Sequence, residues 1–528
     1  MQQHSRMFRN VSANAIARVI YLATRFFIPP FVLGRIGMEA YGLYGTVFVL
    51  VAYFGMSAIG FSSAYVKFVA QFSADGDTCR ANRLLSSGFS MMVVIGTLCF
   101  GIFAACWPLV ALWMKVPAVL DADARALALM IVGVFFAYLA LSVFRDALSG
   151  MQEIAAVQKV WGASFLIETV LIFALVGSGL GLRGLGLAFC ARTLLEVGGN
   201  YLQTKRYIPW LRVRMVVPDR ESLKLLLGFG GIVQLNSMLA IFLNSVERMI
   251  ATPLIGLTAS GLLDIGKRFP GMATSIPSAF AASVVPSAAD IQARAVSKED
   301  EKERLAELYT TTTRSMNAVS GVLFSFLAFS ALPCLMFWLG KVPEGAVILT
   351  VLFAIGSQFH MLTGPGTSIL KASGKPKMEF HYSVANAIAL AVFVPLSKVV
   401  FGGWSATGIA SACTVATIVS ASWFLSRAHR ELGISLKTFA GEIFLPGFMP
   451  YVVRVICLVP ALGLPASGDR LHAAMELALV GTVHLVFTLW ALYSFCANDS
   501  ERMLVKRLVK ERIGRALAPV ASPLMGAD

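Results

Sequence analysis

The run ALALMIVGVFFAYLALSVF at residues 126–144 contains no charged side chain, and its length of about 20 residues is enough to cross a bilayer as an α-helix. Similar apolar runs occupy residues 84–112 and 473–495. These runs are continuous and do not alternate between apolar and polar residues, so they indicate helices and exclude the strands of a transmembrane barrel. The sequence therefore predicts an all-α integral membrane protein.

The composition of the whole chain agrees with this prediction. Of 528 residues, 57% are hydrophobic and only 14% are charged, against about 25% charged residues in an ordinary soluble domain. A chain this apolar cannot cover its surface with polar groups, so most of that surface has to face lipid. About fourteen spans of about 20 residues are expected, near residues 11–33, 42–64, 84–107, 126–147, 157–179, 184–204, 223–247, 256–285, 315–339, 345–370, 382–400, 404–425, 441–463 and 472–495.

The distribution of charge predicts the orientation. The chain has 44 Lys and Arg residues against 29 Asp and Glu residues, a net charge of +15. Loops on the side of the two termini carry about 30 cations and the opposite loops about 8, which places both termini in the cytoplasm. Topology thus explains the excess, and no nucleic-acid partner is expected. The tail from Arg502 to Arg515 is expected to lie as an amphipathic helix on anionic lipids of the cytoplasmic face.

Sequence signatures of catalysis and metal binding are missing. The eight cysteines are scattered without a metal-ligand spacing. There is no phosphate-binding GKS/T loop, no nucleophile elbow and no HExxH motif. We therefore expect no catalytic residues, no metal ion and no organic cofactor, and a protein that is not an enzyme.

An internal repeat organises the chain. IGMEAYGL at 36–43 matches IGLTASGL at 255–262, LWMKVP at 112–117 matches FWLGKVP at 337–343, and Ser149-Gly150 matches Ser373-Gly374. The offset stays between about 219 and 226, which indicates two homologous six-span halves and two extra spans. An even number of spans gives both halves the same orientation, as in transporters whose two lobes alternate access to a path between them. A duplicated channel or scaffold remains an alternative.

The repeat predicts five segments. They are an N-terminal lobe at 1–204, a basic cytoplasmic linker at 205–224, a C-terminal lobe at 225–426, an extra helical hairpin at 427–498 and a basic cytoplasmic tail at 499–528.

A polar stripe marks the first span. At 100° per residue Asn14, Arg18, Tyr21 and Arg25 fall within about 60° of one another on the helix surface. Ionisable groups at membrane depth usually serve function, and the arginine fork suits phosphate. We therefore predict a cavity-facing stripe that binds a phosphate or pyrophosphate head group. Pairing with acidic residues of other helices is the alternative, with Arg18 extending to the membrane surface.

The eighth span carries a second set of charges. Asp264 and Arg268 are four residues apart and can pair on one helix face, which leaves Lys267 as the spare cation. Prolines at 270, 277 and 286 predict a bend in this span. Span seven, which corresponds to span one in the repeat, has uncharged polar residues instead. They are Gln234, Asn236, Ser237 and Asn244, and they fit a substrate with a charged head and a neutral polar body.

Other polar groups fall within spans. Glu168, Arg192 and Glu196 are expected to pair with one another, with Glu168 as a protonation or cation-coupling site in the alternative interpretation. Arg454 and Glu476 are expected to pair within the extra hairpin. The sequence Gly364-Pro365-Gly366 predicts an interruption of span ten.

These residues resemble a known family. The sequence PPFVLGRIGMEAYGLY at 29–44, after the polar first helix, and FVAQF at 68–72 are similar to the polysaccharide transporter (Wzx-like) branch of the MOP flippase superfamily. That superfamily also contains the lipid II flippases and the MATE exporters. The resemblance extends over nearly the whole chain through the order and number of spans.

The resemblance implies a flippase of a bacterial inner membrane. Its substrate would be an undecaprenyl-pyrophosphate-type lipid carrying a repeat unit of O-antigen, exopolysaccharide or capsule. Arg18, Arg25, Lys267 and Arg268 then fall near the pyrophosphate, and Asn14, Tyr21, Gln234, Ser237 and Asn244 line the cavity. Glu168, Asp264 and Glu247 are candidates for coupling to protons, sodium or the membrane potential. Polymerase and chain-length proteins of the same pathway are expected partners.

Two other functions fit the sequence less well. A MATE-like exporter of organic cations is disfavoured because unpaired cavity arginines would repel its substrates. A membrane polysaccharide polymerase is disfavoured because the outer loops are too short to form an active site.

Overall fold

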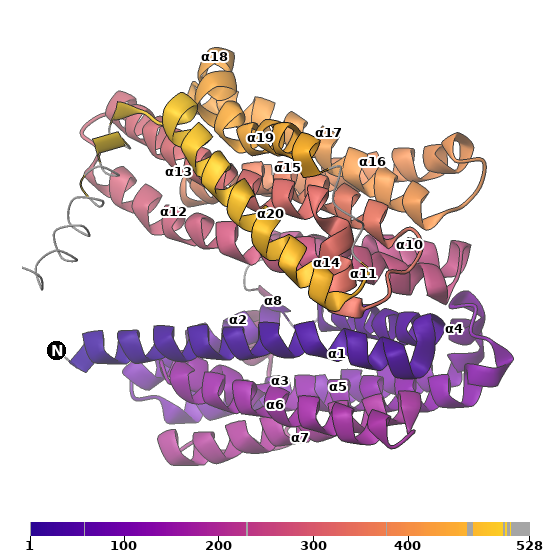
Figure 1. Cartoon of the computed structure of the whole chain (residues 1–528). Coiled ribbons are helices and arrows are strands. Elements are labelled where there is room, and N and C mark those ends of the chain that lie inside the picture. The colour runs from indigo at the N-terminus through magenta and orange to yellow at the C-terminus, as the bar shows by residue number, and fades with distance from the viewer. Residues whose placement is uncertain are drawn as a thin grey trace, which may run out of the picture. The chain divides into compact units, whose positions relative to one another are not determined.

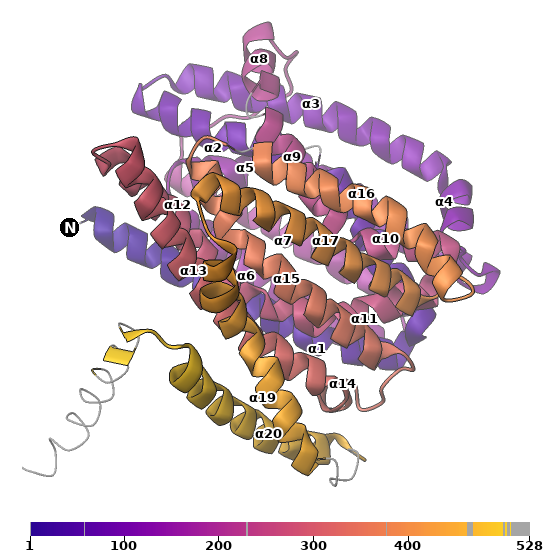
Figure 2. The same ribbon diagram turned by 90° about the horizontal axis from the view of Figure 1, so that it is seen from above.

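The chain folds into α-helices joined by short connections (Figures 1 and 2). The computed structural model describes residues 2–56, 59–228, 231–375, 377–461, 468–499, 502–503 and 507. Within these residues there is no β-strand, so the all-α prediction is confirmed. The helices are α1 (Gln2–Gly55), α2 (Ile59–Ala74), α3 (Thr78–Ala105), α4 (Trp107–Trp113), α5 (Asp121–Gly150), α6 (Ile154–Gly177), α7 (Gly181–Tyr207), α8 (Arg220–Gly228), α9 (Gly231–Asn244), α10 (Val246–Leu254), α11 (Leu257–Ala273), α12 (Ser275–Arg294), α13 (Lys298–Phe329), α14 (Ala331–Leu339), α15 (Ala346–Ala372), α16 (Lys377–Val400), α17 (Ala406–Leu432), α18 (Leu436–Thr438), α19 (Leu445–Ala461) and α20 (Arg470–Ala491).

Helix α1 contains a break at Gly37. This glycine has φ 80° and ψ 171°, outside the helical region and readily adopted only by glycine. A straight helix of 54 residues would be about 80 Å long, far more than the hydrocarbon thickness of about 30 Å. The break therefore separates the first two predicted spans, within the first copy of the repeat motif.

The chain divides into two compact units. The first comprises Met1–Met272, Pro343–Phe353 and Lys375–Ser422, and the second comprises Ala273–Val342, Ala354–Gly374 and Trp423–Asp528. The division into lobes, linker, hairpin and tail stays a prediction.

In the first unit, α1, α6, α7, α5 and α3 lie side by side, each against the next (Figure 1). Small residues allow this close approach: Gly162 of α6 packs on Ala17 of α1, and Gly199 of α7 packs on Val160 of α6. At one end of the row, α2, α3 and α5 share a hydrophobic cluster that includes Tyr65, whose side chain is fully buried.

In the second unit, α13 packs along α12 and α19, and α14 and α19 pack against α20. Its hydrophobic cluster includes Tyr309, whose hydroxyl lies 2.9 Å from Nε2 of His429. Arg454 of α19 is buried and donates to Oγ of Ser330 at 2.9 Å.

The predicted span through Gly364-Pro365-Gly366 is not interrupted. Helix α15 runs through it from Ala346 to Ala372. The glycines serve packing instead, because a Cβ atom on Gly366 would lie 3.2 Å from the Phe424 ring and 3.3 Å from the Tyr309 ring. The prediction of an unwound stretch at this position is therefore wrong.

Several predicted spans are divided into shorter helices, among them 315–339, which is divided between α13 and α14. The segment 42–64 is divided between α1 and α2, 223–247 between α8, α9 and α10, and 256–285 between α11 and α12, which meet at Thr274. Nine described helices are long and apolar enough to cross a membrane, or ten when the bent pair α13 and α14 counts as one span. The chain is thus a multi-pass membrane protein, and the total of fourteen spans stays a prediction.

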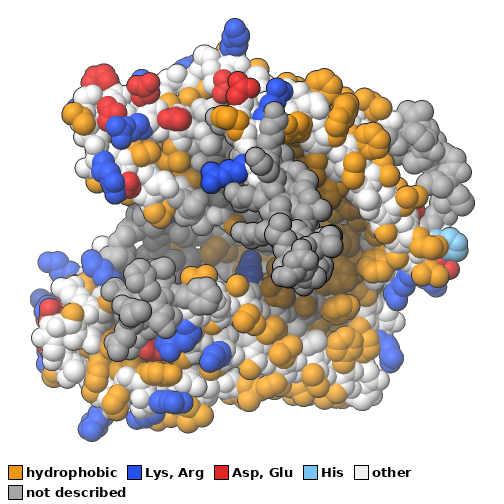
Figure 3. Space-filling model, turned by 60° about the vertical axis from the view of Figure 1, so that its left-hand side comes forward, with side chains coloured by type: hydrophobic (Ala, Val, Ile, Leu, Met, Phe, Trp, Pro, Cys, Tyr) orange, Lys and Arg blue, Asp and Glu red, His pale blue; other side chains and the backbone are white. Residues whose placement is uncertain are grey.

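Apolar side chains are exposed over much of the surface, as the orange side chains in Figure 3 show. Val19 of α1, Val170 of α6, Leu194 and Leu202 of α7 and Phe487 of α20 are among them. Such extensive apolar exposure costs free energy in water but not in lipid.

Candidate functional site

Three residues of the predicted stripe, Arg18, Tyr21 and Arg25, share one face of α1. The Cζ atoms of Arg18 and Arg25 lie 5.5 Å and 5.4 Å from the centroid of the Tyr21 ring, so both guanidiniums contact this ring. That ring packs in turn on Trp161 and Phe165 of α6, at centroid distances of 5.3 Å and 5.1 Å. Tyr21 is thus held by α6 and positions both arginines.

Only one arginine of the stripe has an acidic partner among the described residues. Arg25 Nη2 lies 3.5 Å from Oε2 of the buried Glu168 on α6. Arg18 and Asn14 are exposed, and within the described part of the chain Arg18 has no carboxylate within ion-pair distance. Arg25 is therefore paired with an acidic residue of another helix, which was the alternative interpretation of the stripe. Arg18 has no such counter-charge among the described residues.

Glu168 begins a chain of buried charges. Its Oε1 lies 3.8 Å from Arg192 Nε of α7, and Arg192 Nη1 lies 3.1 Å from Glu196 Oε2. The predicted pairing of these three residues is confirmed. Glu196 also accepts a hydrogen bond from the Tyr138 hydroxyl at 2.9 Å, and that hydroxyl accepts one from Arg145 Nη1 at 2.6 Å.

Arg145 is the last cation of this series of buried charges, and it pairs with its sequence neighbour Asp146, with Nη2 at 2.9 Å from Oδ1. Sequence reasoning missed Tyr138, Arg145 and Asp146, although an Arg-Asp pair directly after the apolar run 126–144 was a signal. We call the seven residues the α1–α7 cluster: Arg25, Tyr138, Arg145, Asp146, Glu168, Arg192 and Glu196. Its three arginines balance three carboxylates, as buried charges require.

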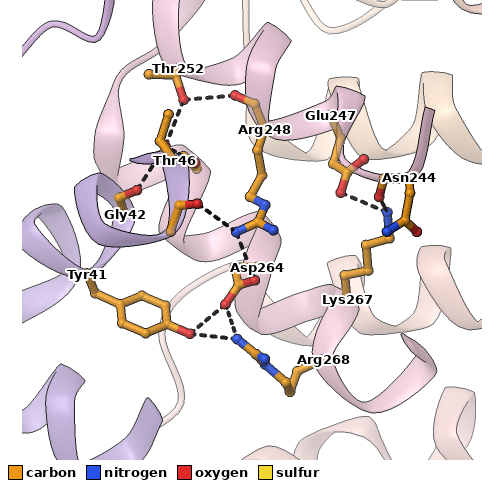
Figure 4. A network of polar contacts seen from close by, with 12 residues as sticks. Tyr41, Gly42, Thr46, Asn244, Glu247, Arg248, Thr252, Asp264, Lys267 and Arg268 are labelled. Atoms are coloured by element: carbon orange, nitrogen blue, oxygen red, sulfur yellow. Dashed lines mark hydrogen bonds and ion pairs between the residues drawn. The ribbon is translucent and has the colours of Figure 1, made fainter. Parts of the chain in front are cut away.

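A second cluster joins α1, α10 and α11 (Figure 4). Asp264 accepts hydrogen bonds from the Tyr41 hydroxyl and from Arg268 Nη2, so the predicted pair on one helix face is confirmed. Its other oxygen lies 3.1 Å from Arg248 Nη1. One carboxylate thus holds two guanidiniums and a phenol.

Lys267 is not the spare cation that the sequence predicted. Its Nζ lies 2.9 Å from Oε1 of Glu247 and also donates to the backbone carbonyl of Asn244. The prediction failed because Glu247 belongs to α10, and only the fold brings α10 next to α11. Glu247 and Arg248 are adjacent in sequence but turn to different partners, Lys267 and Asp264 (Figure 4).

We call these residues the α10–α11 cluster: Tyr41, Glu247, Arg248, Asp264, Lys267 and Arg268. Its three cations exceed its two carboxylates by one. The two clusters adjoin, because Phe26, next to Arg25, packs on Phe269, next to Arg268, at a centroid distance of 6.2 Å.

Arg25 and Arg268 thus belong to adjoining clusters and each has its own carboxylate, with Arg18 further along the stripe of α1 and Lys267 turned toward Glu247. The predicted neutral lining is more dispersed. Asn244 is exposed, Ser237 is half-buried, and the side chain of Gln234 lies outside the described residues. Asn236 accepts a hydrogen bond from Ser383 at 3.2 Å.

The two copies of the repeat motif contact each other. Gly42 and Gly261 occupy equivalent positions in IGMEAYGL and IGLTASGL, and an ideal Cβ atom on Gly42 would lie 1.9 Å from the carbonyl oxygen of Leu257. Beside them, Thr46 Oγ1 lies 2.9 Å from Ser260 Oγ and 3.3 Å from Thr252 Oγ1. The absence of side chains at two glycines thus allows the backbones of α1 and α11 to touch.

These features define a polytopic membrane protein with ionisable groups inside its helical bundle. It has many helices apolar enough to span a membrane and two clusters of ion pairs with a surplus of cations. Residues 8–292, more than half of the chain, match the family model for polysaccharide biosynthesis proteins. The chain belongs to that family, and the resemblance found in its sequence is confirmed.

Comparison with individual proteins agrees. The chain is 24% identical over 351 residues to the uncharacterized membrane protein EpsK of Bacillus subtilis strain 168, covering 65% of this chain and 67% of that protein. Its fold is similar to that of the lipid II flippase MurJ in an inward closed conformation, with a TM-score of 0.70 at 12% identity over 92% of this chain and 98% of that one. It is also similar to an inward-facing multidrug resistance MATE transporter of the MOP superfamily, with a TM-score of 0.65 at 13% identity over 81% and 99% of the two chains.

Proposed function

We propose that this protein is a flippase that moves a polyprenyl-pyrophosphate-linked oligosaccharide from the cytoplasmic to the outer leaflet of a bacterial inner membrane. The observation that carries the proposal is the surplus of positive charge along the stripe of α1 and in the two clusters that adjoin it. Arg18 and the two adjoining clusters contain seven cations and five carboxylates. A site with this surplus favours an anionic head group, and arginine can bind pyrophosphate through two parallel hydrogen bonds.

In this proposal Arg18 contacts the head group first, and Arg25 and Arg268 follow as the lipid moves along the stripe. Lys267 contributes charge from beside Glu247, while Asn14, Tyr21, Ser237, Asn244 and Gln234 contact the neutral sugars. Glu168, Glu247 and Asp264 are the carboxylates through which protons, sodium or the membrane potential would couple. The same surplus disfavours a MATE-like exporter of organic cations.

Alternating access needs a contact that closes and opens between the homologous halves. The backbone contact at Gly42 and Gly261 fits this role because it joins equivalent positions of the two repeats. Glycine backbones gain weak Cα–H···O contacts at short range but contribute no interlocking side chains. Such a contact can separate without repacking a hydrophobic core.

The function is tested by the intermediate that accumulates when the gene is deleted. A flippase defect leaves a complete lipid-linked oligosaccharide unit on the cytoplasmic face of the inner membrane. A unit exposed on the outer face would instead indicate a polymerase and contradict the proposal. The same strain shows whether the pathway's polymerase and chain-length proteins still have a substrate.

Arg18→Ala is expected to reduce export strongly without loss of folded protein. Arg18 is exposed and has no carboxylate partner among the described residues, so its removal leaves no buried charge behind. A charge-assisted hydrogen bond contributes about 1.5–3 kcal/mol, which corresponds to roughly 10- to 100-fold weaker head-group binding. Surface polymer and membrane expression are measured together.

Arg18→Lys should restore only part of the activity, because it keeps the charge and loses the fork. Arg427→Ala is a matched control, since Arg427 is an exposed arginine that also stacks on an aromatic ring, that of Trp423. Wild-type polymer levels in Arg18→Ala would contradict a head-group role for the stripe.

A further inference from the structure

The connection between α7 and α8 is an ordered strap bound to one helix. Residues 208–219 contain no helix, yet their backbone follows α3 closely. The N–H groups of Arg212, Arg214 and Val216 donate to Asn82 Oδ1, Ser86 Oγ and Ser90 Oγ, at 2.7 Å, 3.1 Å and 2.8 Å. We call residues 208–219 the linker strap.

The hydrogen-bond donors of the strap are two residues apart and their acceptors on α3 are four residues apart, and these two spacings have nearly the same length. Four residues of an α-helix rise about 6 Å, and two residues of an extended chain rise about 6.6 Å. Every second N–H of the strap therefore meets every fourth side chain of α3. Ser86 and Ser90 are each 3% exposed, and their buried hydroxyl oxygens accept hydrogen bonds from N–H groups of the strap.

Side chains of an extended chain alternate between two faces. Ile208 is buried before the turn at residues 209–210; in the extended part that follows, Leu211 is buried in the hydrophobic cluster of α2, α3 and α5, and Val213 packs against it. On the outer face Arg212 and Arg214 are exposed. The strap thus holds the two guanidiniums outward, and the apolar residues Met215 and Val217 that follow along the strap are exposed as well.

The surroundings of the strap are basic. The exposed cations on the strap and α8, at the start of α3 and at the end of α7 include Arg80, Arg83, Lys205, Arg206, Arg212, Arg214, Arg220 and Lys224. Two acidic groups lie among them, and both have partners. Glu221 pairs with Arg80, and hydrogen bonds from Ser222 hold the pKa of Asp219 below its usual value while Ser87 donates to the same carboxylate.

We infer that the linker strap is a binding surface for anionic phospholipid head groups. The strap leaves the end of α7, which packs against α5 and α6 and exposes the apolar side chains of Leu194 and Leu202. At the end of a bundle helix, Arg212 and Arg214 would contact the phosphates of lipid head groups. Met215 and Val217 would enter the boundary between head groups and acyl chains, as apolar residues of interfacial segments do. The inference does not depend on what the protein transports.

The test measures lipid affinity by native mass spectrometry of the full-length protein in detergent, titrated with phosphatidylglycerol or phosphatidylcholine. The wild type is expected to prefer phosphatidylglycerol. In Arg212→Gln/Arg214→Gln its affinity should fall about 10- to 30-fold, since each cation near an anionic surface contributes about 1 kcal/mol. The matched control Arg427→Gln/Arg430→Gln removes two exposed arginines from the end of α17.

A second variant separates charge from geometry. Ser86→Ala/Ser90→Ala keeps every cation but removes two of the three acceptors that hold the strap. Amide hydrogen exchange at Arg214 and Val216 should become faster, and affinity for phosphatidylglycerol should fall although the net charge is unchanged.

Three results would overturn the inference. They are wild-type lipid preference in Arg212→Gln/Arg214→Gln, an equal loss in the arginine control, and unchanged lipid affinity when the serine variant has released the strap. Binding of a poly-glutamate peptide to the wild type, without preference for phosphatidylglycerol, would assign the surface to an acidic protein and also overturn it.

Discussion

Gly42→Ala is expected to abolish polysaccharide export, although it adds a single methyl group. That methyl would lie 1.9 Å from the carbonyl oxygen and 2.7 Å from the carbonyl carbon of Leu257. Both atoms are backbone, so no flexible side chain can move aside, and α1 and α11 have to separate. Surface polymer is measured alongside expression of the folded protein.

The same chain offers graded controls. A Cβ atom on Gly261 would meet its nearest neighbours, Met38 O and Met38 Sδ, at 3.0 Å, so Gly261→Ala should have a milder effect. Gly34 also belongs to α1, on the other side of the break at Gly37, and a methyl group added there would meet no atom within 4 Å. Gly34→Ala should leave export at the wild-type level, and equal effects of all three substitutions would contradict a role for close contact.

Reversible closure can be tested at the same contact. The Thr46 and Ser260 hydroxyl oxygens are 2.9 Å apart, so Thr46→Cys/Ser260→Cys should cross-link under oxidation. If the contact opens during transport, the cross-link stops export and a reductant restores it. Each single cysteine variant under the same oxidant controls for the native cysteines, and full export by the cross-linked protein would show that the contact does not open.

Glu168→Ala should cause the largest loss of stability among substitutions of the charged residues. It removes the carboxylate that Arg25 and Arg192 share and leaves Arg25 without a counter-charge on α6. Removing one partner of a buried ion pair costs about 3–5 kcal/mol in free energy of unfolding. Denaturation of the purified protein in detergent measures the loss.

The surface pair Arg80 and Glu221 is the matched control for this substitution. Both side chains are about half exposed, so Glu221→Ala should cost at most about 1 kcal/mol. Combining Glu168→Ala with Arg25→Ala should cost less than the sum of the two single losses, because the second change removes the stranded charge. Additive losses would show that Arg25 and Glu168 do not stabilise each other.

Local patterns were enough to predict much of this molecule. Apolar runs such as 126–144 specify helices because a backbone in lipid has to satisfy its own hydrogen bonds. The shared face of Arg18, Tyr21 and Arg25 and the pair Asp264 and Arg268 follow from helical geometry, which depends only on spacing along the chain. The repeat motif was also visible, although its mutual contact was not.

Partners far apart in the chain could not be predicted in this way. Arg25 and Glu168 are 143 residues apart, and Lys267 finds Glu247 on a different helix. Packing between helices decides which cations have an acidic partner. Lys267 pairs with Glu247, whereas Arg18 has no carboxylate partner among the described residues. The backbone contact of Gly42 with α11 and the strap along α3 likewise arise from packing between segments, because hydropathy and helical period describe one segment at a time.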